Sequence, residues 1–234
     1  MAGLNVYTSN RLESLVERLA NVVREQPSSP LISEVIVVQS KGMERWLSME
    51  LARALGVWAN CRYPFPNRFA LEIFKTLLAD VPAMELLDTD ADVWRIMRLL
   101  PQYIERQGFE PIRTYLGESQ LNLKRLQLSE RIADLFDTYA VYRPELVLAW
   151  DAGKESLWQS DLWRSLFGEE GSTHRAKIWR QALTKLKEGD FTKEALPGRV
   201  SIFGIPVLPR YHFEVLKGLA QYCDIHLFLL NPSR

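Results

Sequence analysis

The chain has 234 residues, of which 47% are hydrophobic and 25% are charged, a composition typical of a water-soluble globular protein with a sizeable core. Its 29 basic and 29 acidic residues cancel, which excludes a strongly basic nucleic-acid module as a whole-chain property but not a local basic groove. The sequence has no apolar run of membrane-spanning length, no signal peptide and only two isolated cysteines, Cys61 and Cys223. We therefore expect a cytoplasmic protein without disulfides, zinc or membrane contact.

The first 66 residues alternate between strand-like and helix-like patterns. We expect strands over Leu4–Thr8 and Glu34–Gln39 and helices over Arg11–Glu25 and Gly42–Leu55, the last of which ends at Gly56. The second strand contains a continuous apolar run, as a strand buried on both faces of a sheet requires. Strands and helices that alternate in this way are typical of a parallel α/β sheet.

Helical periodicity dominates the middle of the chain, from Asn67 to Leu186. Apolar residues recur there three or four positions apart, and prolines and glycines separate the runs. We therefore expect a bundle of six to eight helices.

The α/β pattern returns near the C-terminal end. We expect a strand over Arg199–Phe203, a helix over Arg210–Tyr222 and another buried strand over Asp224–Leu230. Because the chain ends directly after a strand that resembles a central one, we expect it to be part of a longer protein.

A sheet that begins, is interrupted by helices and then resumes predicts an α/β fold with a large all-α insertion. The first motor domain of a superfamily 1 helicase has this organisation. On this interpretation, residues 1–66 and 197–234 form a helicase-like domain 1A with a parallel sheet, and residues 67–196 form a helical insertion domain 1B.

The positions that would bind ATP in such a motor lack the residues that this chemistry needs. A phosphate loop requires glycines and a lysine, but the first strand continues into Ser9-Asn10-Arg11, which suits the start of a helix better. A Walker B strand ends in an aspartate that holds Mg²⁺, but here the strand continues into Gly204-Ile205. We therefore interpret the sheet as a degenerate P-loop-like fold that does not hydrolyse ATP, and we expect no cofactor.

The second strand ends in Gln39-Ser40 just before a helix. Superfamily 1 helicases carry motif Ia at this place, where polar side chains and helix N-terminal amides contact the backbone of a single strand. A strand that ends in this way is more often followed by a simple helix cap, so the two interpretations stay open.

Two further features carry a weak signal of chemistry. Asp134 and Asp137 lie three residues apart on one helix face, where their like charges repel unless a cation or a base edge lies opposite; a solvated face is the more common explanation. The three histidines, His174, His212 and His226, have no metal-ligand spacing, and we expect His226 to be packed within its strand.

Six short motifs follow one another along the whole chain. They are Val6-Tyr7-x-Ser9-Asn10-Arg11-Leu12, Val38-Gln39-Ser40-x-Gly42-Met43-x-x-Trp46-Leu47, Ala59-Asn60-x-x-Tyr63-Pro64-x-Pro66, Ala133-Asp134-Leu135-Phe136-Asp137-x-Tyr139-x-Val141-Tyr142-Arg143-Pro144, His174-Arg175-Ala176 and Phe203-Gly204-Ile205-x-x-Leu208-Pro209. In this order they resemble the RecC family, the gamma subunits of exodeoxyribonuclease V, and they match the N-terminal portion of that family.

The resemblance implies a helicase fold without helicase chemistry. RecC subunits scaffold the RecB and RecD motors in DNA double-strand break repair by homologous recombination. They split the incoming duplex at a DNA fork, thread the 3′-ended single strand through a channel and read the Chi sequence there, while RecB supplies the nuclease. The resemblance therefore implies a non-catalytic part of an ATP-dependent exodeoxyribonuclease V complex.

The resemblance also implies which residues line the DNA channel. By the matching motifs these are Gln39, Asp134, Leu135, Asp137, Arg143 and Arg175, and we also expect Ser40, Lys41, Arg45 and Phe65 to bind DNA. Arginines suit phosphate or guanine, the aspartates suit exocyclic amines, and a leucine can pack on a base. Lys41, Arg45 and Phe65, together with Leu71, depart from the best-known family members, so we do not expect the familiar Chi octamer.

Two alternatives remain. In the first, the chain is a protein–protein docking module of a helicase complex and makes no direct contact with DNA; its zero net charge favours this alternative. In the second, it is an AddB-type helicase–nuclease subunit. An AddB-type subunit would carry a Walker A lysine, which is absent here, and a C-terminal cysteine cluster.

Overall fold

A computed structural model describes residues 2–25, 29, 31–78, 89–117, 122–168 and 173–231. The strands are β1 (Gly3–Ser9), β2 (Glu34–Val37), β3 (Cys61–Arg62), β4 (Arg199–Phe203) and β5 (Asp224–Leu230). The α-helices are α1 (Leu12–Glu25), α2 (Lys41–Leu55), α3 (Pro66–Leu77), α4 (Thr89–Tyr103), α5 (Glu110–Leu116), α6 (Asn122–Tyr142), α7 (Pro144–Asp151), α8 (Trp158–Phe167), α9 (Arg175–Glu188) and α10 (Arg210–Leu219), and Lys193–Ala195 form a 3₁₀ turn.

The chain divides into two compact units. The first contains Met1–Ala79 and Ala182–Arg234, and the second contains Asp80–Gln181. Their limits therefore lie inside the residues 67–196 that the sequence assigns to the insertion, because α3 and the end of α9 belong to the first unit.

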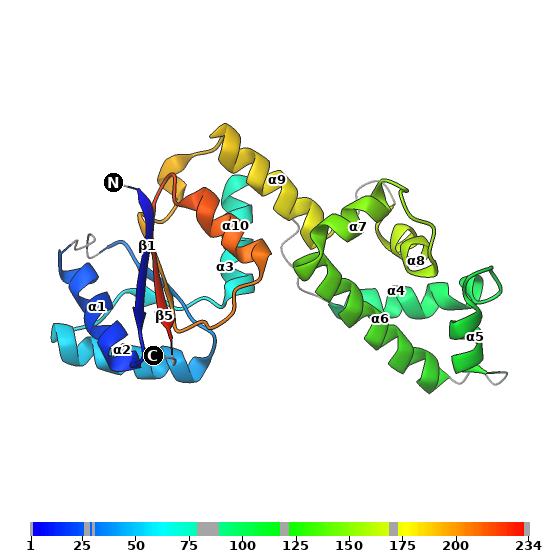
Figure 1. The fold of residues 1–234 in the computed structure, drawn as a ribbon, viewed down its shortest axis with the longest axis horizontal. Helices are drawn as coiled ribbons and strands as arrows, with labels where there is room; N and C mark the ends of the chain where they lie inside the picture. Colours follow the sequence, from blue (N-terminus) through cyan, green and yellow to red (C-terminus); the bar gives the residue numbers. More distant parts are fainter. Residues whose placement is uncertain are drawn as a thin grey trace. The chain divides into compact units, whose positions relative to one another are not determined.

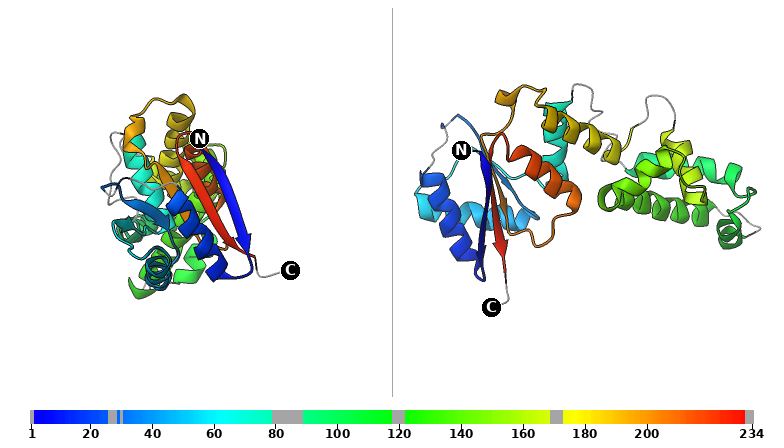
Figure 2. Two further views of the ribbon diagram at one scale, coloured as in Figure 1. Left: turned by 90° about the vertical axis from the view of Figure 1, so that its left-hand side faces the viewer. Right: turned by 45° about the horizontal axis from the view of Figure 1, so that its top comes forward.

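A single parallel sheet joins the two ends of the sequence in the first unit. The strand order is β1-β5-β4-β2-β3, and β1 pairs with β5 in parallel from Gly3 with Asp224 to Ser9 with Leu230. β4 pairs with both β5 and β2. Figures 1 and 2 show β1 and β5 side by side in each view. The predicted α/β fold with one parallel sheet is thus confirmed.

Helices cover both faces of this sheet (Figure 1). Leu19 of α1 and Leu47 of α2 are fully buried in one core cluster with Phe203 and Phe228. On the other face, α3 and α10 enclose a small cavity with Val37 of β2 among its lining residues. All residues of β2 and β4 are buried, as their apolar runs predict.

The structure shortens two predicted elements at their carboxyl ends and adds one short strand. β2 ends at Val37 instead of Gln39, because the backbone bends at Gln39 and Ser40 begins α2 as its N-cap. α10 ends at Leu219 instead of Tyr222. The short strand β3 was not predicted, since two residues carry no periodicity.

Apolar and aromatic side chains hold the second unit together. Phe136 of α6, Trp150 of α7 and Trp163 of α8 are buried and meet edge to face, with ring centroids 5.3–6.1 Å apart. Such contacts add to the free energy gained by burying the rings. From α3 to α9 the described residues contain seven α-helices, within the predicted six to eight. No described helix is both long and apolar enough to traverse a bilayer.

A buried ion pair links β2 to β4 at their amino ends. The Arg199 guanidinium binds both carboxylate oxygens of Glu34, and it also donates to the Val22 carbonyl of α1 (3.2 Å). The side chains are 6% and 11% exposed. Because a buried charge without its partner is costly, this pair favours the arrangement in which the amino ends of β2 and β4 are neighbours.

Removal of one partner from this ion pair should destabilise the fold strongly. We expect Glu34→Ala to lower the free energy of unfolding by about 3–5 kcal/mol, since it leaves the guanidinium buried without its carboxylate. Arg68→Ala, which breaks an exposed pair with Glu72 on α3, should cost less than about 1 kcal/mol. Chemical denaturation measures both, and equal losses would contradict this account.

Candidate nucleic-acid interface

The first group of predicted site residues lies at the carboxyl edge of the sheet. Gln39, Ser40 and Lys41 follow β2, and Phe65 follows β3. Because β2 and β3 are parallel neighbours, their carboxyl ends lie together, and this edge is where open α/β sheets commonly bind ligands. Lys41 Nζ lies 5.8 Å from the centre of the Phe65 ring.

Ser40 begins α2 as an N-cap. Its extended backbone (φ −152°, ψ 157°) places the side-chain Oγ where it accepts a hydrogen bond from the Met43 amide (3.1 Å), the usual capping geometry. Lys41 pairs with Glu44 at 2.7 Å and remains exposed. The cap interpretation is therefore confirmed, and the positive end of the α2 dipole lies beside the Lys41–Glu44 ion pair.

Gln39 and Arg45 are exposed beside this group. Arg45 lies four residues after Lys41, which places both cations on one face of α2. The sheet edge therefore brings five of the predicted residues together: Gln39, Ser40, Lys41, Arg45 and Phe65.

The ends of β1 and β4 lie at the same edge. Ser9 Oγ accepts a hydrogen bond from the Arg11 amide (3.1 Å) at the start of α1. After β4, Gly204 has φ +65°, and a Cβ atom there would lie 3.4 Å from Met43 Cε. At this edge, β1 is thus followed by the start of a helix, and β4 by a glycine close to an apolar side chain.

The second group lies in the second unit, around α6 and the start of α9. Arg175 Nε lies 3.0 Å from Asp137 Oδ1, with the two side chains 12% and 33% exposed. Burial raises the pKa of Asp137, Arg175 opposes this shift, and Asp134 adds to it. The cation that the spacing of Asp134 and Asp137 requires is therefore Arg175.

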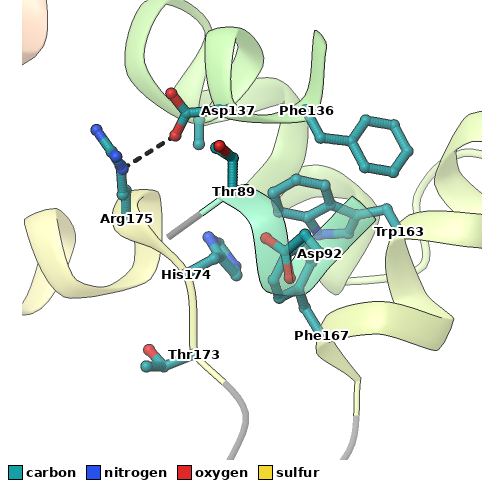
Figure 3. A pocket seen from close by; sticks show the side chains of 10 residues that line it. Thr89, Asp92, Phe136, Asp137, Trp163, Phe167, Thr173, His174 and Arg175 are labelled. Carbon is teal, nitrogen blue, oxygen red and sulfur yellow. Dashed lines mark ion pairs between the residues drawn. The ribbon is translucent and has the colours of Figure 1, made fainter. Parts of the chain in front are cut away.

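A pocket opens beside this ion pair (Figure 3). Thr89 and Asp92 of α4 line it together with Asp137 and Arg175, and aromatic side chains form its wall. Phe136, Trp163, Phe167 and His174 are these aromatic residues. The pocket thus combines polar groups with the edges of largely buried rings.

The remaining predicted residues surround α6. Asp134 is exposed and Leu135 is half-buried on α6, while Arg143 follows the end of that helix with an exposed side chain. The Arg143 backbone amide donates to the Tyr139 carbonyl (2.8 Å). Asp134, Leu135, Asp137 and Arg175 thus cluster in this unit, and Arg143 lies beyond the helix end.

A hydrogen-bonded network that was not predicted from the sequence lies next to Arg175. His174 Nε2 lies 2.8 Å from Asp151 Oδ2, and Trp163 Nε1 donates to Asp151 Oδ1 at 2.8 Å. Burial alone would raise the pKa of Asp151, but the hydrogen bonds from His174 and Trp163 outweigh it and lower that pKa. His174 directly precedes Arg175, and this adjacency was the only signal in the sequence.

His226 is packed in the sheet as predicted. It is 4% exposed, stacks on Tyr7 with ring centroids 5.9 Å apart, and lies 3.2 Å from the Tyr7 hydroxyl through Nδ1. Burial, together with the nearby Arg199 charge, lowers the pKa of His226. In the described part of the chain, no group of three or more His, Cys, Asp and Glu residues is arranged to hold a metal ion.

Comparison with known proteins identifies the family. Residues 4–234 match the family model for RecC, N-terminal domain. The RecBCD enzyme subunit RecC of Haemophilus influenzae is 36% identical over 262 residues, which cover 98% of this chain and 23% of that protein. The RecBCD enzyme subunit RecC of Escherichia coli is 35% identical over 244 residues, which cover 99% of this chain and 22% of that protein.

A more distant relative, the RecBCD enzyme subunit RecC of Mycolicibacterium smegmatis, is 29% identical over 238 residues and again matches 98% of this chain. The chain belongs to the RecC family, whose N-terminal domain it matches. It spans about a fifth of the length of these relatives.

Loss of the Ser40 cap should weaken α2 by a modest amount. We expect Ser40→Ala to lower the free energy of unfolding by about 1 kcal/mol, because the Met43 amide loses its acceptor. Ser40→Asp, which can accept the same hydrogen bond, should restore most of this loss in chemical denaturation. Equal destabilisation by both substitutions would contradict the capping role.

Asp151 should make the second unit sensitive to acid. Because its folded-state pKa lies below the ordinary value of 3.8, its stabilising contribution is present above pH 3.8 and is lost as the pH falls through the lowered folded-state value. When the pH falls from neutral to below the folded-state pKa of Asp151, the free energy of unfolding of Asp151→Asn should therefore decrease less than that of the wild type. Trp163→Phe, which removes one donor, should give an intermediate slope; a slope unchanged by Asp151→Asn would contradict this assignment.

Proposed function

We propose that this chain is the N-terminal, non-catalytic part of the gamma subunit of a RecBCD-type exodeoxyribonuclease V. Membership of the RecC family over residues 4–234 carries this proposal. The subunit would act in the cytoplasm in double-strand break repair by homologous recombination, assembled with RecB-type and RecD-type motor and nuclease subunits on forked DNA.

The ends of β1 and β4 support a role without ATP hydrolysis. We interpret the parallel sheet with its helical insertion as a helicase-like domain 1A and 1B whose nucleotide site has degenerated. Ser9 contacts a backbone amide and Gly204 lies close to Met43, so neither position offers the lysine or the carboxylate that holds ATP and Mg²⁺. Catalysis would then belong to the partner subunits.

The two groups of site residues would contact the 3′-ended single strand. At the sheet edge, the exposed cations Lys41 and Arg45 suit phosphates, and Phe65 offers a ring for stacking. In the second unit, Arg143 and Arg175 suit phosphate or guanine, and Asp134 and Asp137 suit exocyclic amines. Such groups suit recognition of a Chi-type sequence as well as simple passage of the strand.

A docking role without DNA contact is the second candidate. The balance of 29 basic and 29 acidic residues favours it, since a strand-binding subunit gains affinity from net positive charge. On this alternative, the same arginines would contact a motor subunit instead of DNA.

Arginine substitutions in the assembled complex separate the two functions. We expect Arg143→Ala and Arg175→Ala to leave assembly intact, to abolish the response to the regulatory sequence and to reduce the salt dependence of strand binding, because each removes a cation that binds phosphate or guanine. Arg18→Ala, on the exposed side of α1, should behave as the wild type. Loss of assembly with the first two variants would favour docking and overturn the proposal.

A further inference from the structure

His174 makes contacts in two directions from one buried position. It is 5% exposed and packs against the rings of both Trp163 and Phe167, with centroids 4.8 and 5.5 Å away. On one side its Nε2 meets Asp151 Oδ2 at 2.8 Å. On the other side its Nδ1 accepts a hydrogen bond from the Lys177 amide at 3.4 Å.

These two contacts define the state of the imidazole. Because an amide N–H can only donate, Nδ1 is the acceptor, and Nε2 is then the ring nitrogen that donates to the Asp151 carboxylate. Trp163 donates to the second carboxylate oxygen at 2.8 Å. Asp151 at the end of α7 is therefore fixed by α8 and in turn fixes the orientation of the histidine ring.

The contact between His174 Nδ1 and the Lys177 amide lies at the start of α9. The His174 carbonyl accepts from the Lys177 amide (3.1 Å) and the Ile178 amide (3.2 Å), so His174 occupies the N-cap position and its Nδ1 acts as the capping side chain. Arg175 is the next residue and the first of the helix. Its direction therefore depends on how the preceding residue is held.

We propose that His174 is a positioning residue: its bond to Asp151 holds the first turn of α9 so that the Arg175 guanidinium meets Asp137 of α6. Figure 3 shows His174 and Arg175 on consecutive positions at the edge of the pocket, with the Arg175–Asp137 ion pair across from the aromatic wall. Asp137 and Arg175 come from separate helices, α6 and α9. The burial of Ala176 and Ile178 packs α9 against the core, and the bond from His174 to Asp151 adds a polar tether at its first turn.

The consequence for DNA depends on the proposed function. If Arg175 contacts the single strand, His174 orients that contact without touching the strand itself. The tether, in contrast, is a property of the chain alone, so it can be tested without DNA.

The titration of Asp137, followed by NMR in the 234-residue chain, reports whether Arg175 is in place. The charged groups that face it are Arg175 and Asp134, with Asp92 in the same pocket. A nearby guanidinium lowers the pKa of a carboxyl group by about 1–3 units. His174→Ala should therefore raise the pKa of Asp137 by about one unit or more, because Arg175 is no longer held against it.

Two conservative variants separate the tether from the cap. His174→Gln can still donate to Asp151 and should keep the Asp137 titration close to that of the wild type. His174→Asn can cap the helix but is too short to reach Asp151, so it should behave as His174→Ala. A wild-type titration in His174→Asn or in His174→Ala would overturn the proposal.

A control substitution separates positioning from general loss of stability. Leu116→Ala removes a buried side chain of α5 from the same core cluster and should destabilise the unit by about 2–5 kcal/mol without moving the Asp137 titration. An equal pKa rise in this variant would show that His174 has only a structural role, and it would overturn the proposal.

Strand binding by the assembled complex completes the test. With a forked duplex that carries a 3′ single-stranded tail, His174→Ala and Arg175→Ala should weaken binding or recognition to the same extent, and the double variant should add nothing. If Arg175→Ala has no effect while the Asp137 titration still depends on His174, the proposed function fails and the positioning role stands.

Discussion

The parallel pairing of strands from the two ends of the chain is the constraint on which the rest of the structure depends. β1 binds β5 along all seven of its residues, and β4 lies between β5 and β2. The buried Glu34–Arg199 pair fixes β4 beside β2 at the amino ends. Because every strand runs the same way, the segments that follow them meet at one edge, where Gln39, Ser40 and Phe65 lie.

The two groups of candidate residues are built on different physical principles. At the sheet edge, a helix cap and the end of a buried strand hold the polar residues, so their positions follow from local backbone geometry. In the second unit, Arg175 and Asp137 come from separate helices, and the side-chain contacts of His174, Asp151 and Trp163 help to hold them in place. The geometry of the helical group therefore depends on side-chain contacts between separate helices.

Much of the fold could be predicted from the sequence because its strongest signals are local. The apolar runs of β2 and β4 and the helical periodicity between them require burial on defined faces, and the repeated strand–helix order predicts a parallel sheet. β3 escaped prediction because its two residues have no period and are placed by pairing with Glu34 and Val35. The spacing of Asp134 and Asp137 predicts that a cation or a base edge lies opposite them. The sequence alone does not identify that cation as Arg175, because only the fold brings α9 next to α6.

The missed interactions join residues far apart in the sequence. Glu34 and Arg199 are separated by 165 positions, and Asp151 and His174 by 23. A charged residue in a strand-like run and a lone histidine before a helix each have several common explanations, and only the pairing of their elements in space decides among them. The family resemblance supplied candidate residues, but it could not supply these contacts.

A structure of the assembled complex on a forked duplex with a 3′ single-stranded tail tests the central claim most directly. The account predicts that the strand contacts both the carboxyl edge of the sheet at Lys41 and Phe65 and the α6–α9 surface at Arg175, with no nucleotide bound beside Ser9. A strand that follows another route, with both surfaces covered by a motor subunit, would contradict it.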